Sequence, residues 1–281
     1  MLASTSEMLG AAQRGGYAIG GFNIYNLEGI KAVVDAAEQL SSSVLLQLHP
    51  AALDIGGMPL IDLCLSYARH ARVPVGVHLD HTTSRTTIQN ALDAGVRSVM
   101  ADGSHLPYAE NVAFVRDIVR SAHSSHAVVE AELGRISGTE DGLTVTEMES
   151  RMTVPQQARQ FVEETGADML AVCIGNVHGP YRLPPRLDFA RLEQIRDLVE
   201  VPLVLHGASG LGSDLIRQSI RLGVCKFNVN TEVRQAYLHA LRSATHAPDS
   251  DLTAVMQASI RAMGEIVNQK IELFGSKNSA E

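Results

Sequence analysis

The sequence predicts an α/β protein of the (β/α)8 TIM barrel class, with an additional C-terminal helix. Eight short apolar runs recur along the 281 residues, and amphipathic segments separate them. The repeat length of about 25–35 residues is typical of alternating strands and helices around a barrel. A hydrophobic content of 45% allows a large core. We therefore expect one barrel domain over residues 1–281, with a doubly wound open sheet as the alternative.

Each expected strand is a short apolar run bounded by polar residues, as in a buried parallel sheet. In chain order the expected strands are 17–23, 43–48, 73–80, 96–102, 127–133, 168–175, 202–207 and 225–230. Active sites of such barrels lie at the C-terminal ends of the strands. Polar residues at these ends are therefore the candidate site residues.

Between the strands, apolar residues return at helical spacing. The clearest helical patterns cover 30–40, 111–122 and 215–223, with a final amphipathic helix over about 252–274. Glycines typical of helix C-caps precede three expected strands, at Gly95, Gly166 and Gly223. The polar segment 133–155 is expected to be a mobile loop. The final helix is expected to cap the barrel or to pair with another subunit.

Composition excludes several classes of partner. The net charge of −8 does not favour nucleic acid or an anionic membrane surface. No apolar stretch approaches the roughly 18 residues that span a bilayer, and the N-terminus lacks a signal-peptide pattern. Cys64, Cys173 and Cys225 are interpreted as small core residues in a reducing compartment, which indicates a cytoplasmic protein.

Three histidines each end an apolar run beside a glycine or an aspartate. They are His81 in VGVHLDH, His178 in CIGNVHG and His206 in PLVLHGASG. Three imidazoles at one barrel edge fit a catalytic metal site, which keeps a coordination position open. Glu132 is an alternative ligand, or orients one. Strand alternation places His78 behind the site or in the core, unless the strand bends.

Three loops after the late strands are candidate oxyanion sites: HGPYR (178–182), HGASG (206–210) and NVNTE (228–232). Their small residues let backbone N–H groups approach a phosphate, and helices follow the last two. Arg182 supplies a positive charge nearby. The arrangement indicates a substrate with a phosphate at one end and a carbonyl near the metal.

Two carboxylates are candidates for proton transfer. Asp80 adjoins a metal ligand and can hydrogen-bond a substrate hydroxyl. Glu140 lies on the loop after the fifth strand, where a general base would act once the loop excludes water. The alternative interpretation of Glu140 is a solvated loop charge.

At these residues the sequence resembles the class II, zinc-dependent ketose-bisphosphate aldolases of the fructose and tagatose types. The resemblance runs from 20–26 to the final helix and is closest to the tagatose type. The motifs that carry it are HLDH (78–81), ADGSHLPYAEN (101–111), VEAELGRISGTEDG (129–142), AVCIGNVHGPY (171–181), PLVLHGASG (202–210) and KFNVNTE (226–232).

The resemblance implies a role for each matching residue. It implies that His81, His178 and His206 bind zinc and that Glu132 belongs to a second metal position. It assigns proton transfer at the cleaved carbon to Asp80, and at the enediolate carbon of dihydroxyacetone phosphate to Glu140. Asn23 and Asn228 would hydrogen-bond the enediolate. The implied phosphate site comprises Gly179, Arg182, Gly207, Ser209, Asn230 and Thr231.

The resemblance also implies a monovalent cation, sodium or potassium, near the phosphate, and a homodimer or homotetramer. A lysine Schiff base is not required. Lys226 is the one lysine near an expected strand, and it would begin that strand, at the wrong end for such chemistry.

Two departures from the family pattern fall on the aldehyde half. His49 stands where many relatives have serine or threonine, and Thr253 stands where an arginine grips the far phosphate. One hypothesis is that the aldehyde is not simply glyceraldehyde 3-phosphate, and that His49 contacts it. The other is that Arg234 or Arg261 replaces the missing arginine.

Two further functions compete with an aldolase. A barrel metal hydrolase also uses histidines and an aspartate, but it would not need three phosphate-type loops. A catalytically silent accessory subunit would not need the three histidines together with Asp80 and Glu140.

Overall fold

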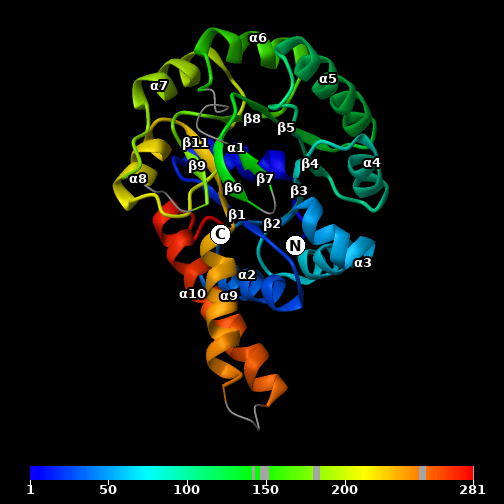
Figure 1. The fold of residues 1–281 in the computed structure, drawn as a ribbon, viewed down its shortest axis with the longest axis vertical. Helices are drawn as coiled ribbons and strands as arrows, with labels where there is room; N and C mark the ends of the chain where they lie inside the picture. The colour runs from blue at the N-terminus through cyan, green and yellow to red at the C-terminus, as the bar shows by residue number, and fades with distance from the viewer. Residues whose placement is uncertain (141–142, 146–151, 180–183, 247–250, 281) are drawn as a thin grey trace.

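A computed structural model describes residues 1–140, 143–145, 152–179, 184–246 and 251–280, with the backbone alone for 137–140 and 143–145. Eight parallel strands close into a barrel in the order β1-β11-β10-β8-β5-β4-β3-β2 (Figure 1). The barrel strands are β1 (Ile19–Asn23), β2 (Val44–Leu48), β3 (Val75–Thr82), β4 (Ser98–Ala101), β5 (Val128–Leu133), β8 (Met169–Val172), β10 (Leu203–Leu205) and β11 (Val224–Val229). All eight expected strands and the barrel class are confirmed.

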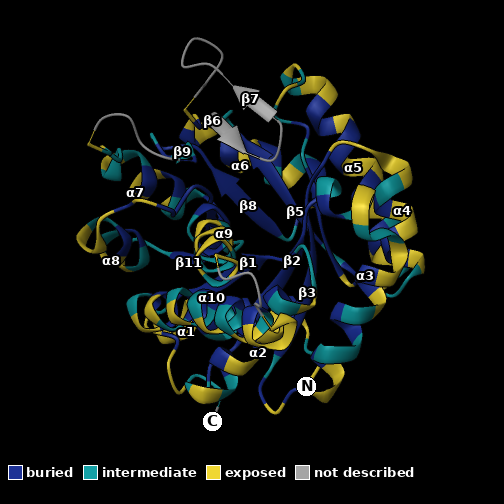
Figure 2. Cartoon of the chain, turned by 60° about the horizontal axis from the view of Figure 1, so that its bottom comes forward, coloured by how far each residue is buried: buried dark blue, intermediate teal, exposed yellow. Residues whose placement is uncertain are grey.

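Helices surround the barrel, and their outer faces are exposed while the strands are buried (Figure 2). They are α1 (Thr5–Gly15), α2 (Leu27–Gln39), α3 (Pro50–His70), α4 (Arg85–Asp93), α5 (Tyr108–Ser124), α6 (Pro155–Thr165), α7 (Phe189–Leu198), α8 (Ser213–Arg221), α9 (Thr231–Ala244) and α10 (Leu252–Phe274). As expected, Gly166 is a left-handed C-cap, at φ 71° after α6.

Helix α1 closes the N-terminal end of the barrel. Its Met8, Leu9 and Ala12 pack with Ile19 and Leu45 in an apolar cluster. Because this end is filled with apolar side chains, polar groups can gather only nearer the opposite end. The three cysteines are buried and free, as expected, and burial raises the pKa of the Cys64 thiol to about 12.

Helix α10 spans the expected range and packs beside α2 and α9. Its last residue, Phe274, stacks on Phe227 of β11 at 4.9 Å between ring centroids. Helix α10 therefore lies along the outside of the barrel. Toward its start, α10 and α9 form a hairpin that projects away from the barrel (Figure 1).

Helix α3 is long and apolar enough to cross a membrane by length and composition alone, which the sequence did not lead us to expect. However, Gly57 breaks it with φ 59°, and Pro59 follows. Leu60, Ile61 and Cys64 of its second part are buried. Helix α3 therefore has the features of a helix that covers a barrel.

Within the segment 133–155, which we expected to be a mobile loop, the described residues include two strands. Strands β6 (Ser137–Glu140) and β7 (Leu143–Val145) pair antiparallel, and β6 also pairs with β9 (Val177–His178). His178 lies on a strand of its own, because β8 stops at Val172 and β9 is separate from it. The hairpin is thus tied by backbone hydrogen bonds to the strand that carries His178.

Candidate metal centre

His81, His178 and His206 meet at the C-terminal end of the barrel. Their candidate ligand nitrogens all lie within 4.8 Å of one another. Nε2 of His81 lies 2.6 Å from Nδ1 of His206. The ring of His178 meets that of His81 edge-on, with 4.9 Å between centroids. The structure thus brings together the three histidines selected from the sequence.

A local distortion of β3 delivers two neighbouring side chains to this site. The pairing of β3 with β4 shifts between Leu79 and Thr82, and His81 has the left-handed φ of 40°. Side chains normally alternate across a strand, so consecutive residues would face opposite sides. The bend allows Asp80 and His81 both to reach the site. Regular alternation places His78 on the same face as Asp80 but two residues lower, in the core, with Nδ1 2.8 Å from Ser98 Oγ.

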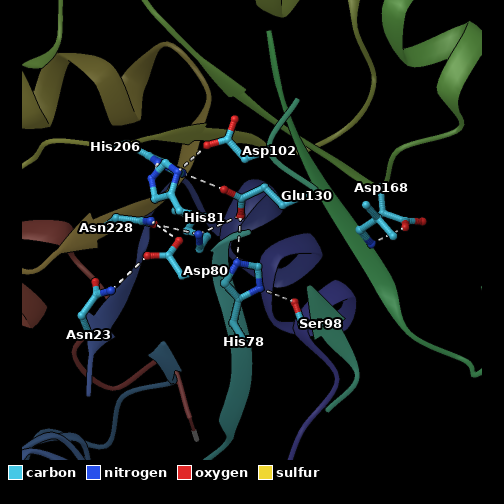
Figure 3. A network of polar contacts seen from close by, with 12 residues as sticks. Asn23, His78, Asp80, His81, Ser98, Asp102, Glu130, Asp168, His206 and Asn228 are labelled. Carbon is cyan, nitrogen blue, oxygen red and sulfur yellow. Dashed lines mark hydrogen bonds and ion pairs between the residues drawn. The ribbon is translucent and has the colours of Figure 1, made fainter. Parts of the chain in front are cut away.

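In His81 and His206, the ring nitrogen that does not face the other histidine is hydrogen-bonded to a carboxylate (Figure 3). Nδ1 of His81 lies 2.9 Å from Asp102, and Nε2 of His206 lies 2.7 Å from Glu130. If these nitrogens carry the protons, the facing nitrogens of two neutral rings both present lone pairs. Two lone pairs 2.6 Å apart repel unless a cation lies between them. The donor set therefore fits a metal ion that takes imidazole ligands.

The pKa directions differ among the three histidines. Burial lowers the pKa of His81, but Asp80 and the hydrogen bond to Asp102 outweigh it, so the pKa stands well above the ordinary value. Burial and repulsion from His81 lower the pKa of His206 and of His178. Burial thus favours the neutral form of His206 and His178, the form in which imidazole binds a metal.

Glu132 is a buried carboxylate next to this cluster. It groups with His81 and Asp102 as a second set of candidate ligands. Its Oε2 has no hydrogen-bond partner within the described part of the chain. Burial and the neighbouring Asp102 raise the pKa of Glu132 to about 8. A buried, unsatisfied carboxylate oxygen is costly, so Glu132 fits a group that contacts a cation.

Asp80 is held by two amides. Its Oδ2 accepts from Asn23 Nδ2 and its Oδ1 from Asn228 Nδ2, both at 3.0 Å. Burial would raise the pKa of Asp80, but His81, His206 and Lys226 hold it far below its ordinary value. The carboxylate is therefore ionised and fixed in orientation beside the histidines.

The loops after β10 and β11 and the segment around β9 provide backbone for an anion. Gly207 has φ 68°, and a Cβ there would lie 2.1 Å from the carbonyl oxygen of Val177. Helix α9 begins after Asn230, whose side chain does not cap it but accepts a 2.9 Å hydrogen bond from Tyr25. Ser209 and Thr231 are buried at these loops, and Gly179 follows His178 with φ 79°. These are the features of a phosphate site at a helix N-terminus.

The remaining expected residues have different outcomes. His49 lies against the site, with its ring centroid 6.4 Å from that of His81, and its Nδ1 accepts from the Ala51 amide. The side chain of Glu140 and the whole of Arg182 lie outside the described residues. Thr253 is in the first turn of α10, at the tip of the projecting hairpin, and its hydroxyl bonds Asp251 (Figure 1).

Sequence reasoning missed the residues beneath the ligands. Glu130 and Lys226 are fully buried and form an ion pair of 2.7 Å. Lys226 is the third residue of β11 and not its first, so the expected placement was wrong. The one available signal was the spacing of Glu130 and Glu132, because two residues two apart on a strand share a face.

Comparisons with known proteins agree with the geometry. A family model described as class-II fructose-bisphosphate aldolase matches residues 3–279. The chain is similar to the YdjI aldolase from Escherichia coli, with 35% sequence identity, a TM-score of 0.88 and complete coverage (100%) of both chains. It is also similar to a Coccidioides immitis protein described provisionally as a fructose-1,6-bisphosphate aldolase. That match has 34% identity, a TM-score of 0.93, and coverage of 98% of this chain and 97% of the other.

A more distant structure shares the fold. The fructose-bisphosphate aldolase from Campylobacter jejuni is 20% identical, with a TM-score of 0.80 over 99% of this chain and 96% of its own. At this identity the likeness shows the barrel architecture alone.

Proposed function

Because the chain belongs to the class II fructose-bisphosphate aldolase family, we propose that it reversibly cleaves a ketose 1-phosphate or 1,6-bisphosphate of the fructose or tagatose type. The products are dihydroxyacetone phosphate and an aldehyde. The observation that carries the proposal is the ionised Asp80, fixed by two amides beside three converging histidines. A metal hydrolase has no comparable need for the adjoining phosphate-type loops. We place the enzyme in the cytoplasm.

His81, His178 and His206 would hold zinc, and Glu132 would serve a second metal position. Neutral imidazole suits zinc and disfavours magnesium or calcium, which prefer oxygen ligands. When bound, the ion supplies a Lewis acid that stabilises negative charge developing on the substrate's ketone oxygen. Asp102 and Glu130 keep the ligand rings in the required orientation.

Asp80 would accept the proton of the substrate hydroxyl on the carbon that becomes the aldehyde. As that O–H bond breaks, the neighbouring C–C bond breaks and its electron pair passes to the ketone half as an enediolate. Asn23 and Asn228 would donate to the enediolate oxygens, since both amides already lie at Asp80. Glu140 would then deliver a proton to the enediolate carbon. The reverse sequence forms the C–C bond.

The phosphate would bind to the backbone of the late loops and to the start of α9. Gly179, Gly207, Ser209, Asn230 and Thr231 supply small or hydroxyl-bearing positions there, and Arg182 would add positive charge. A sodium or potassium ion beside the phosphate would complete the charge balance. We also propose that the enzyme works as a homodimer or homotetramer.

The aldehyde half is the more distinctive part of the site. His49 is buried beside His81, whereas Thr253 lies at the hairpin tip, where its hydroxyl donates to Asp251. We propose that His49 contacts an aldehyde other than glyceraldehyde 3-phosphate. If fructose 1,6-bisphosphate were cleaved as efficiently as any other ketose, and His49→Ser lost nothing, this part of the proposal would fail.

The decisive experiment is cleavage of a panel of ketose 1-phosphates and 1,6-bisphosphates, coupled to detection of dihydroxyacetone phosphate, with and without EDTA. We expect release that EDTA abolishes and zinc restores. Asp80→Asn should lower kcat by about 10²–10⁴-fold while zinc content stays unchanged. No release from any substrate by the zinc-loaded enzyme would refute the proposed function.

A further inference from the structure

Lys226 is a buried cation to which the aldol mechanism assigns no role. It lies inside the barrel beneath the histidines and is fully buried. Its Nζ donates to Glu130 Oε2 at 2.7 Å and to Asn228 Oδ1 at 2.7 Å. A lysine without solvent contact is rare and is held only where its charge is matched. The question is what these two hydrogen bonds do.

The first bond acts on a candidate metal ligand. Glu130 shares its carboxylate between Lys226 at Oε2 and the ring of His206 at Oε1, each at 2.7 Å. An ionised carboxylate only accepts hydrogen bonds, so it requires the proton of His206 to sit on Nε2. Nδ1 then presents its lone pair to the centre of the site. Lys226 keeps Glu130 ionised in an interior that would otherwise disfavour the charge.

The second bond acts on an amide that faces the substrate. Lys226 donates to Asn228 Oδ1, so the NH2 group of Asn228 must turn the other way, where it donates to Asp80 at 3.0 Å. A flipped amide would place its NH2 group against an ammonium and its oxygen against a carboxylate. Two repulsive contacts therefore exclude the wrong amide orientation, one with the ammonium of Lys226 and one with the carboxylate of Asp80.

The charges of the cluster also fit this role. Asp80, Asp102 and Glu130 each accept two or more hydrogen bonds, as ionised carboxylates do. The ammonium of Lys226 offsets one of these three negative charges. Without Lys226, one buried carboxylate would remain uncompensated.

We propose that Lys226 is a positioning residue of the aldol reaction, whose ammonium fixes both the ring nitrogen that His206 presents to the metal and the amide face that Asn228 presents to the substrate. The proposal rests on the proposed function in its second half only. The first half concerns metal binding and holds for any chemistry at the site.

The main test variant is the double substitution Lys226→Met with Glu130→Gln, because it removes both charges and leaves no unpaired buried ion. Zinc affinity is measured by competition with a chelator, and ligand geometry by the visible spectrum of the cobalt-substituted protein. We expect about 10–100-fold weaker zinc binding and an altered cobalt spectrum. At saturating zinc we expect kcat to fall at least about tenfold with little change in KM, because a misoriented amide acts on the reacting atoms.

The single variant Glu130→Gln separates the two halves and provides the measurement should the double variant not fold. It breaks the ionic contact with His206 but leaves the bond from Lys226 to Asn228. We expect weaker zinc binding, with kcat largely restored at saturating zinc. The matched control is the exposed ion pair of Glu272, in α10, and Lys277, just after α10, whose charged atoms lie 3.1 Å apart. Lys277→Met with Glu272→Gln should change neither zinc affinity, nor the cobalt spectrum, nor kcat.

Wild-type zinc affinity and an unchanged cobalt spectrum in both Glu130 variants would overturn the proposal. So would a double variant whose kcat at saturating zinc equals that of the wild type. If the wild type itself released no dihydroxyacetone phosphate, the proposed function would fail, while the zinc and cobalt measurements would still decide the role of Lys226.

Discussion

His78 shows how burial sets the charge of a single side chain. Its ring is inaccessible to solvent, and Nδ1 bonds Ser98 Oγ at 2.8 Å. Burial, followed by repulsion from Lys226, lowers the pKa of His78 to about 4, although Glu130 and Asp80 act in the opposite direction. The ring is therefore neutral at neutral pH, and it adds no charge to the cluster beneath the ligands.

This lowered pKa makes stability depend on pH in one direction. Between about pH 6.5 and 4 the unfolded chain binds a proton at His78 and the folded chain does not, so stability falls as the pH falls through this range. We expect the free energy of unfolding of the wild type to drop by on the order of 2 kcal/mol more than that of His78→Gln between about pH 7 and pH 5. Urea unfolding of both EDTA-treated proteins measures the difference. Parallel pH dependences would show that His78 does not contribute.

The loop from β10 to α8 offers a test at the level of an element. Gly207 has φ 68°, and a Cβ there would meet the carbonyl oxygen of Val177 at 2.1 Å, so neither its conformation nor its surroundings admit a side chain. We expect Gly207→Ala to cost about 2 kcal/mol or more in stability and to raise KM for phosphorylated substrates. Thermal unfolding and steady-state kinetics measure the two effects.

Gly212 provides the control within the same loop. It has the ordinary φ of −62° as the N-cap of α8, and a Cβ there would have no neighbour within 4 Å. Gly212→Ala should change stability by less than about 1 kcal/mol and leave KM unaltered. Equal effects of the two substitutions would mean that the loop backbone near Gly207 does not shape the phosphate site.

Elements whose signal is local were predictable, and elements that depend on distant partners were not. The eight barrel strands are continuous apolar runs, and α10 has a clear helical period, so both are found from sequence. Strand β9 has two residues and exists because β6 pairs with it, which no local pattern reports. Lys226 was expected to begin its strand, but β11 starts one residue earlier than expected, at Val224, and the partner of Lys226, Glu130, lies 96 positions away.

Across the whole molecule, polarity is arranged along the barrel axis. Helix α1 and its apolar cluster close one end, the ion pair of Lys226 and Glu130 lies beneath the ligands, and the three histidines occupy the other end. The histidines and Asp80 were identifiable because each interrupts an apolar run. The layer beneath them was not, because a buried ion pair becomes recognisable only when both strands are in place.

The hairpin of α9 and α10 leads to the last prediction, on assembly. It projects from the barrel (Figure 1), and apolar side chains remain exposed on it, with Leu252 73% and Leu238 38% accessible. Exposed apolar surface on a projecting element indicates a surface that a second copy covers. We expect light scattering to give the mass of two or four chains of 30.2 kDa each.

Leu238→Asp with Leu252→Asp should shift that mass toward 30.2 kDa, because burying two carboxylates in an apolar interface is costly. Ile55→Asp is the control, since Ile55 is 90% exposed but belongs to α3. If the hairpin variant kept the wild-type mass while Ile55→Asp reduced it, the subunit contact would lie at α3. A wild-type mass of one chain would show that the exposed leucines serve no contact between copies.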